Sequence, residues 1–207
     1  MLRSVLIVED HPICVAALTM AAHAYDSAIE VESLATLKEA RERISQKKFD
    51  AILLDLGLKD SQGLANVSVL HSVGKAVPIL VVSSNDSLLV MARARALGAS
   101  GFLSKAAPMS EMTRAISAVM NGETYFIREL ESINEGDAEE AAIARLSPAQ
   151  TKVMVELAQG HANKIIAYEL GLSEATVKSH LSAIFKALGV SNRAQAILAL
   201  KAQDLGE

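Results

Sequence analysis

The chain has 207 residues, 51% of them hydrophobic, and a formal net charge of −4. This length allows two modest domains, each with its own core, and no apolar run is long enough to cross a bilayer. Cys14 is the only cysteine, which excludes an intrachain disulfide and a cysteine-based metal site. Because Glu9 and Asp10 interrupt the first apolar run too early for a signal peptide, we expect a cytoplasmic protein.

In the first part of the chain, short apolar runs alternate with stretches of helical periodicity. Strands are predicted at residues 4–8, 29–32, 51–54, 78–82 and 101–103, and helices at 13–22, 37–44, 63–73, 88–97 and 108–120. We expect the last of these helices to be capped near Ser110. Strands that alternate with helices in this way predict an α/β, flavodoxin-like sheet of parallel strands.

Residues 129–140 contain six acids and few large apolar side chains, which is typical of a linker. We therefore expect a first domain at residues 1–124, a linker at 125–144 and a second domain at 145–207. From residue 146 onward there are six basic and five acidic side chains, a net charge of +1, so the preceding part carries −5. This mild asymmetry permits nucleic-acid binding by the second domain.

The second domain is predicted to be a small all-α domain. Ser147 and Pro148 are typical of a helix start, and that helix runs to Gly160. Two further helices, at residues 162–170 and 174–188, are separated only by Gly171, Leu172 and Ser173, which predicts a helix-turn-helix. A last helix is expected at 192–200.

Acidic side chains follow two of the predicted strands. Glu9 and Asp10 come after the first strand, where a nucleotide-binding fold would need a glycine-rich turn, and Asp55 comes after the third. In a flavodoxin-like sheet these strands are neighbours, so their carboxyl ends would bring the three acids together as an oxygen cluster suited to Mg²⁺. Ser83 and Lys105 end the fourth and fifth strands at the same edge.

This ordered combination resembles the receiver domain of response regulators. The resemblance implies that Asp55 accepts a phosphoryl group from the phosphohistidine of a sensor kinase. It further implies a Mg²⁺ ion held by Glu9, Asp10, Asp55 and the Gly57 carbonyl, with Lys105 and Ser83 contacting the phosphoryl group. Phe102 would be the switch aromatic that turns inward after phosphorylation.

One position departs from the usual pattern of that family. Lys59 stands where a proline commonly follows the phosphoacceptor by four residues, and it either competes for the phosphoryl group or faces water. Together with the flexible Gly57, it leaves the rate and lifetime of phosphorylation open.

Within the predicted helix at 174–188, Val177, Leu181, Ile184 and Leu188 form one apolar stripe. The whole segment from Asn163 to Val190 resembles the LuxR-type DNA-binding domain, and a receiver followed by such a domain resembles the NarL/FixJ family of response regulators. The resemblance places the helix from Glu174 in the DNA major groove. The implied DNA-contacting residues are Lys164, Thr176, Lys178, Ser179, His180, Ser182 and Lys186.

The chain differs from the residues usual in this family at Gln150, Lys152 and Ser182. The family's individual base contacts therefore cannot be transferred to this chain. Because the domain is nearly neutral, we expect two copies to bind an inverted repeat, paired through the last helix.

The sequence is therefore interpreted as a two-component transcription regulator rather than a turnover enzyme. One alternative is an aspartyl-phosphate enzyme such as a hydrolase of the haloacid type, but such enzymes need a second acid two positions beyond the nucleophile, where this chain has Gly57. The other is a regulator that ignores phosphorylation and responds to a partner, a ligand or the redox state of Cys14.

Overall fold

The computed structural model describes residues 3–61, 63–74, 77–131, 143 and 145–204. The chain divides into two compact units, an N-terminal and a C-terminal one, which are described separately. Within the described ranges no helix has the length and apolar character needed to cross a membrane.

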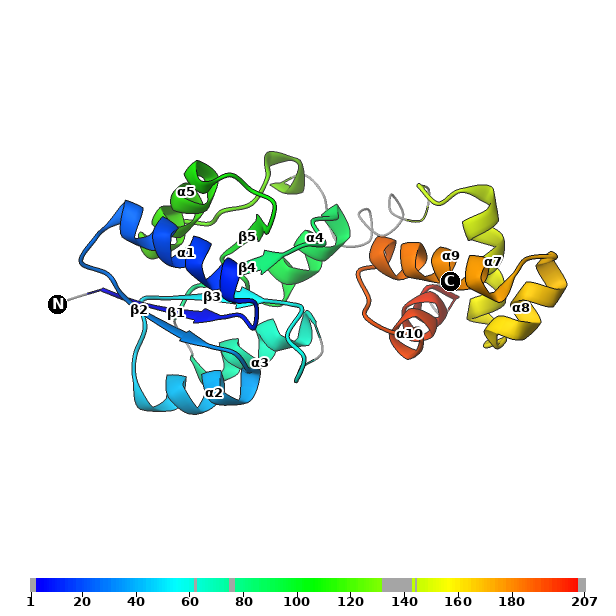
Figure 1. Ribbon diagram of the computed structural model, residues 1–207, viewed down its shortest axis with the longest axis horizontal. Coiled ribbons are helices and arrows are strands. Elements are labelled where there is room, and N and C mark those ends of the chain that lie inside the picture. Colours follow the sequence, from blue (N-terminus) through cyan, green and yellow to red (C-terminus); the bar gives the residue numbers. More distant parts are fainter. Residues whose placement is uncertain (1–2, 62, 75–76, 132–142, 144, 205–207) are drawn as a thin grey trace. The chain divides into compact units, whose positions relative to one another are not determined.

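The N-terminal unit is built on a five-stranded parallel sheet (Figure 1). Its strands are β1 (Ser4–Val8), β2 (Glu30–Leu34), β3 (Ala51–Asp55), β4 (Ile79–Ser83) and β5 (Gly101–Ser104), in the spatial order β2-β1-β3-β4-β5. Helices α1 (Pro12–Tyr25) and α5 (Met109–Met120) cover one face, and α2 (Leu37–Gln46) and α3 (Ala65–Val73) cover the other. Helix α4 (Leu88–Ala96) connects β4 to β5. The predicted fold class is confirmed.

The central strands are buried on both faces. Every residue of β1, β3 and β4 is buried, which explains why these strands read as continuous apolar runs. Side chains of Val5, Ile7 and Leu53 pack with α1 and α5 in one apolar cluster. β2 lies at an edge, and its burial follows the predicted alternation only in part, because Val31 and Glu32 are both half-buried.

The expected cap at Ser110 is wrong. Pro108 is the N-cap of α5, with ψ of 157°, and Ser110 already lies inside the helix. The Pro108 carbonyl accepts hydrogen bonds from the Glu111 and Met112 amides, at 2.9 and 3.1 Å, so the first turn forms without a side-chain cap. α3 also begins later than expected, at Ala65.

The C-terminal unit contains α7 (Pro148–Ala158), α8 (Asn163–Leu170), α9 (Glu174–Ala187) and α10 (Arg193–Asp204). Gly171 ends α8 with φ of 64°, a left-handed conformation that favours glycine, and Ser173 caps α9 by accepting the Thr176 amide. The predicted stripe from Val177 to Leu188 is buried against α7 and α8. The helix-turn-helix geometry is therefore present.

The expected linker is only partly described. A short 3-10 helix, η1 (Arg128–Glu131), lies within it, and Arg95 of α4 donates a hydrogen bond of 2.5 Å to the Leu130 carbonyl. Residues 132–142 and 144 lie outside the described residues, so the predicted linker stays a prediction.

Candidate functional site

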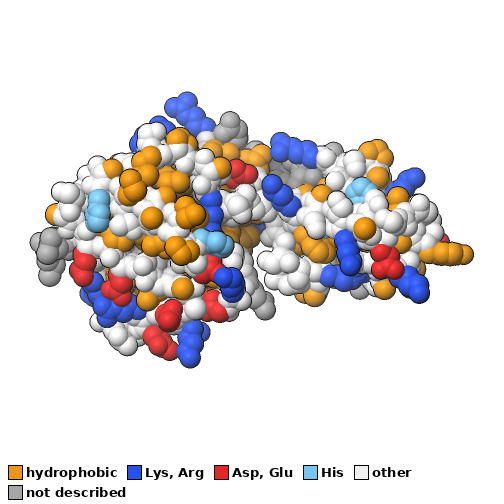
Figure 2. Space-filling model, in the orientation of Figure 1, with side chains coloured by type: hydrophobic (Ala, Val, Ile, Leu, Met, Phe, Trp, Pro, Cys, Tyr) orange, Lys and Arg blue, Asp and Glu red, His pale blue; other side chains and the backbone are white. Residues whose placement is uncertain are grey.

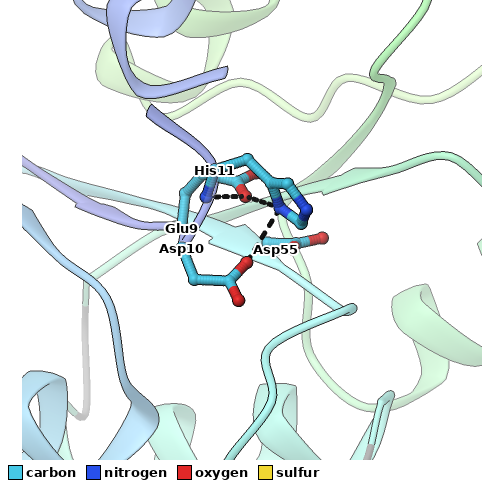
Figure 3. Close-up of side chains that lie close together, drawn as sticks. All are labelled: Glu9, Asp10, His11 and Asp55. Atoms are coloured by element: carbon cyan, nitrogen blue, oxygen red, sulfur yellow. Dashed lines mark hydrogen bonds and ion pairs between the residues drawn. The ribbon is translucent and has the colours of Figure 1, made fainter. Parts of the chain in front are cut away.

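Three acidic side chains and one histidine meet at the carboxyl end of the sheet. Glu9, Asp10 and His11 follow β1, and Asp55 is the last residue of β3, the strand next to it. One ligand atom from each of the four lies within 4.8 Å of the others. Figure 3 shows them gathered where the two strands end. The pairing of β1 with β3 therefore creates the acidic cluster expected from the sequence.

Lys105 is the central cation of this cluster. Its Nζ atom lies 2.6 Å from Glu9 Oε2 and 2.9 Å from Asp55 Oδ2. Burial disfavours the charged ammonium, but the two carboxylates outweigh burial and raise the pKa of Lys105. Burial has the largest effect on Asp55 and raises the pKa of its carboxyl. The hydrogen bond from the Gly57 amide and the contact with Lys105 act in the opposite direction and lower this pKa.

The surroundings of Asp55 leave little space. The Gly57 amide donates a hydrogen bond of 2.9 Å to Asp55 Oδ1, and a Cβ atom on Gly57 would lie 3.3 Å from Asp55 Oδ2. Ser83 is the last residue of β4; its hydroxyl accepts the Asn85 amide at 3.1 Å. Its carbonyl accepts the Lys105 amide at 2.8 Å. Phe102 in β5 is only 4% exposed, so its ring is already buried.

The sequence interpretation gave His11 no role, although it directly follows the two acids. His11 Nδ1 lies 2.9 Å from Glu9 Oε1 and 2.8 Å from Asp10 Oδ1. The His11 amide also donates a hydrogen bond of 2.9 Å to Glu9 Oε1. His11 therefore orients both carboxylates, and its adjacency to them was the available signal.

The cluster fits a hard divalent cation. Four carboxylate oxygens gather there: Glu9 Oε2, both Asp10 oxygens and Asp55 Oδ2. Each lies 2.6 to 3.0 Å from a side-chain nitrogen of Lys105, Lys59 or His11, and together they carry negative charge that a divalent ion also compensates. Carboxylate oxygens are the ligands that Mg²⁺ prefers, so the donor set agrees with the predicted ion.

Lys59 also belongs to the site, through a contact that the sequence did not predict. Its Nζ lies 3.0 Å from Asp10 Oδ2. This ammonium holds the pKa of the Asp10 carboxyl below its usual value.

A second polar surface lies on α9. Lys178, Ser179, Ser182 and Lys186 are exposed, opposite the buried stripe, while Thr176 and His180 are half-buried. The Ser182 hydroxyl donates a hydrogen bond of 3.0 Å to the Lys178 carbonyl, and Thr176 Oγ1 lies 2.8 Å from Ser173 Oγ at the helix start. Lys164 is exposed near the start of α8. On the face seen in Figure 2, Lys and Arg side chains are spread over the C-terminal unit with few acidic ones between them.

Comparison with known proteins agrees with this geometry. Residues 5–117 match the response regulator receiver domain, and residues 144–200 match the luxR family of bacterial regulatory proteins. The fold and sites thus define a transcriptional response regulator. The chain belongs to the NarL/FixJ family of two-component response regulators, with a receiver domain and a LuxR-type DNA-binding domain.

Individual relatives extend over nearly the whole chain. A glycerol metabolism activator of Pseudomonas putida is 35% identical, over 94% of this chain and 93% of that protein. The virulence factors regulator BvgA of Bordetella pertussis is 30% identical, over 99% and 100%. The structure of RcsB from Salmonella enterica serovar Typhimurium bound to a promoter shares the fold, with a TM-score of 0.61, 19% identity and coverage of 98% and 100%.

Proposed function

We propose that Asp55 is the phosphoacceptor of this regulator. A carboxylate oxygen of Asp55 attacks the phosphorus atom carried by a histidine of a sensor kinase; the new P–O bond forms as the P–N bond breaks, and the histidine nitrogen recovers a proton. The observation that carries the proposal is the position of Asp55: it is buried at the end of β3, 2.9 Å from the Lys105 ammonium and beside two further acids.

The surrounding residues have distinct proposed roles. Lys105 pairs with a phosphoryl oxygen, and the Ser83 hydroxyl donates to another. Glu9, Asp10, Asp55 and the Gly57 carbonyl would hold a Mg²⁺ ion, which supplies positive charge beside the phosphoryl oxygens when it is bound. The protein performs this transfer on itself and is no turnover enzyme. The inward turn of Phe102 stays a prediction, and the burial of its ring leaves little further movement in that direction.

Phosphorylation then controls DNA binding in the cytoplasm. We infer that α9 enters the major groove, with Lys178, Ser179 and Ser182 nearest the bases. Lys164, Thr176, His180 and Lys186 contact phosphates or support such contacts. Two copies bind an inverted repeat and pair through α10, where Leu198 is 69% exposed.

A phosphate-affinity gel tests the phosphoacceptor. We expect a small phosphodonor with Mg²⁺ to shift the wild-type protein and to leave Asp55→Asn unshifted. Asp50→Asn is the matched control, because Asp50 lies at the opposite end of β3 and contacts Ser4, and it should shift like the wild type. Equal modification of Asp55→Asn would show that the acceptor lies elsewhere.

Operator binding at several salt concentrations tests the DNA-binding face. Lys178→Ala should weaken binding and reduce the salt slope by about 1, as expected for the loss of one phosphate neutralisation. Lys152→Ala, which removes an exposed lysine from α7, is the control. If Lys178→Ala and Lys152→Ala bind the operator equally well, α9 is wrongly assigned as the DNA-binding helix.

The alternative of redox control through Cys14 has one observation against it. Burial, with the Glu9 carboxylate next in effect, raises the pKa of the Cys14 thiol, so little reactive thiolate is present at neutral pH. DNA binding that is equal in wild type and Asp55→Asn, with and without phosphodonor, would instead favour a regulator that ignores phosphorylation.

A further inference from the structure

Lys59 contacts the acidic cluster but has no part in the proposed transfer. Lys59 lies in the loop between β3 and α3, and its side chain is 85% exposed, whereas that of Asp10 is only 7% exposed. Its Nζ nevertheless lies 3.0 Å from Asp10 Oδ2, while His11 lies beside the other oxygen of the same carboxylate. An exposed lysine thus brings its charge to one of the proposed cation ligands.

The loop that carries Lys59 is anchored on both sides of this residue. Leu58, immediately before it, is 3% exposed and packs into the core. Asp60, immediately after it, accepts hydrogen bonds from the Leu37 and Lys38 amides, at 3.1 and 3.2 Å. These amides lie in the first turn of α2, where backbone N–H groups lack intrahelical partners and the helix dipole favours a carboxylate. The backbone at Lys59 is therefore positioned by the fold, within reach of Asp10.

The contact occupies an oxygen that a divalent cation would need. Nζ of Lys59 lies within hydrogen-bond distance of Asp10 Oδ2, so the ammonium brings this oxygen both charge and a donor. A divalent ion has twice the charge and would also be held by Glu9 and Asp55, so it would displace such an ammonium.

We propose that Lys59 is a built-in competitor for the divalent-cation site: its ammonium occupies Asp10 and lowers the affinity of the acidic cluster for Mg²⁺. The ion must displace Lys59 before it binds Asp10, so Lys59 sets the Mg²⁺ concentration at which Asp55 becomes competent for phosphorylation. This inference rests on the proposed function, because it concerns the same cation site.

Direct metal binding by the full-length protein tests the proposal without any phosphorylation. Mn²⁺ is the probe, and electron paramagnetic resonance measures the free ion in a titration. Lys59→Met removes the charge and keeps much of the side-chain length, so it should bind Mn²⁺ about tenfold more tightly than wild type at low salt, because one repelling charge a few ångströms away is gone. The difference should shrink as added salt screens the exposed ammonium.

Two matched variants make the result specific. Lys59→Arg keeps the positive charge and should bind Mn²⁺ like the wild type. Lys48→Met removes an exposed lysine before β3, at the opposite end of the sheet, and should also leave the affinity unchanged. Circular dichroism and thermal unfolding check that each variant is folded. Equal affinity of wild type and Lys59→Met, or an equal gain in Lys48→Met, would overturn the proposal.

Asp10→Asn distinguishes this inference from the proposed function. If wild type binds Mn²⁺, Asp10→Asn binds it weakly and Lys59→Met matches wild type, the cation site stands and the role of Lys59 is wrong. If Asp10→Asn binds as well as wild type, the cation site is wrongly assigned and the role of Lys59 falls with it, whereas the phosphate-affinity gel on Asp55→Asn decides separately whether Asp55 is the acceptor.

Discussion

The ammonium of Lys105 lies 2.9 Å from Asp55 Oδ2 and joins the end of β5 to the end of β3 across the intervening strand β4. The same Nζ contacts Glu9 at the end of β1. One cation thus compensates two buried carboxylates from different strands. Its removal has consequences for stability that are separate from its proposed part in phosphoryl transfer.

Lys105→Met should destabilise the receiver domain. Without the ammonium, Glu9 and Asp55 remain buried without a compensating charge, and breaking a buried ion pair from one side costs about 3 kcal/mol. Urea unfolding in EDTA measures this loss. The double variant Lys105→Met with Asp55→Asn should recover part of it, because one uncompensated charge is then removed. A double variant no more stable than the single one would contradict this account.

Gly57→Ala should slow phosphorylation while the fold is retained. The added Cβ would lie 3.3 Å from Asp55 Oδ2, within the space that a phosphoryl group needs. Gly57 is not among the glycines with positive φ, so alanine fits the backbone. We expect a rate with a small phosphodonor reduced about tenfold, since small misplacements of reacting groups are costly. A rate equal to that of wild type, at equal thermal stability, would show that the phosphoryl group lies elsewhere.

The ion pair between Arg43 in α2 and Glu32 in β2 should make stability depend on pH. Arg43 Nε lies 2.6 Å from Glu32 Oε1, and this hydrogen bond lowers the pKa of Glu32. The stabilisation is therefore complete above the usual glutamate pKa of 4.5 and disappears as the pH falls through the lowered value. Arg43→Met should lower the urea midpoint at pH 7 by a small amount, and this difference should vanish in strong acid.

Arg41→Met is the control for that experiment, because Arg41 is exposed on the same helix. It should leave the urea midpoint nearly unchanged at both pH values. If the urea midpoint of Arg43→Met is still below that of wild type in strong acid, lost packing and not the ion pair causes the difference.

Ser147→Ala should loosen the start of α7. The Ser147 hydroxyl accepts the Gln150 amide, and the Gln150 side chain accepts the Ser147 amide at 2.8 Å, which completes a capping box. Loss of such a cap costs about 1 kcal/mol. Amide hydrogen exchange in α7 should accelerate accordingly, and Gln150→Ala should accelerate it less. Unchanged exchange in both variants would show that Pro148 and the packing of α7 suffice.

Much of the fold follows from the pattern of apolar residues, and the features that this pattern does not predict have physical causes. Ala51 to Leu54 are buried on both faces, so a short apolar run was a sufficient signal for β3. The start of α5 was predicted to within one residue, but its cap was predicted wrongly: Ser110 is a good cap by residue type, whereas Pro108, with extended backbone, is the N-cap.

The acidic cluster was predictable because parallel strands end at the same edge, which brings Asp55 to Glu9 and Asp10. The position of Lys59 was not. The loop that carries it is anchored by Asp60 at the first turn of α2, through hydrogen bonds to residues 22 and 23 positions away that no periodicity reveals. Gln150, which appeared only as a departure from the DNA-binding family, has a structural use in the capping box.

The complete burial of β1, β3 and β4 also determines which motions the receiver domain can make. Amides in such strands exchange with solvent only when the whole domain opens, whereas surface loops open at little cost. Asp55 belongs to this slowly exchanging frame, but Lys59 and Gly57 lie in the loop beyond it. Chemical modification of Asp55 would therefore leave the frame rigid and change mainly the populations of its loops.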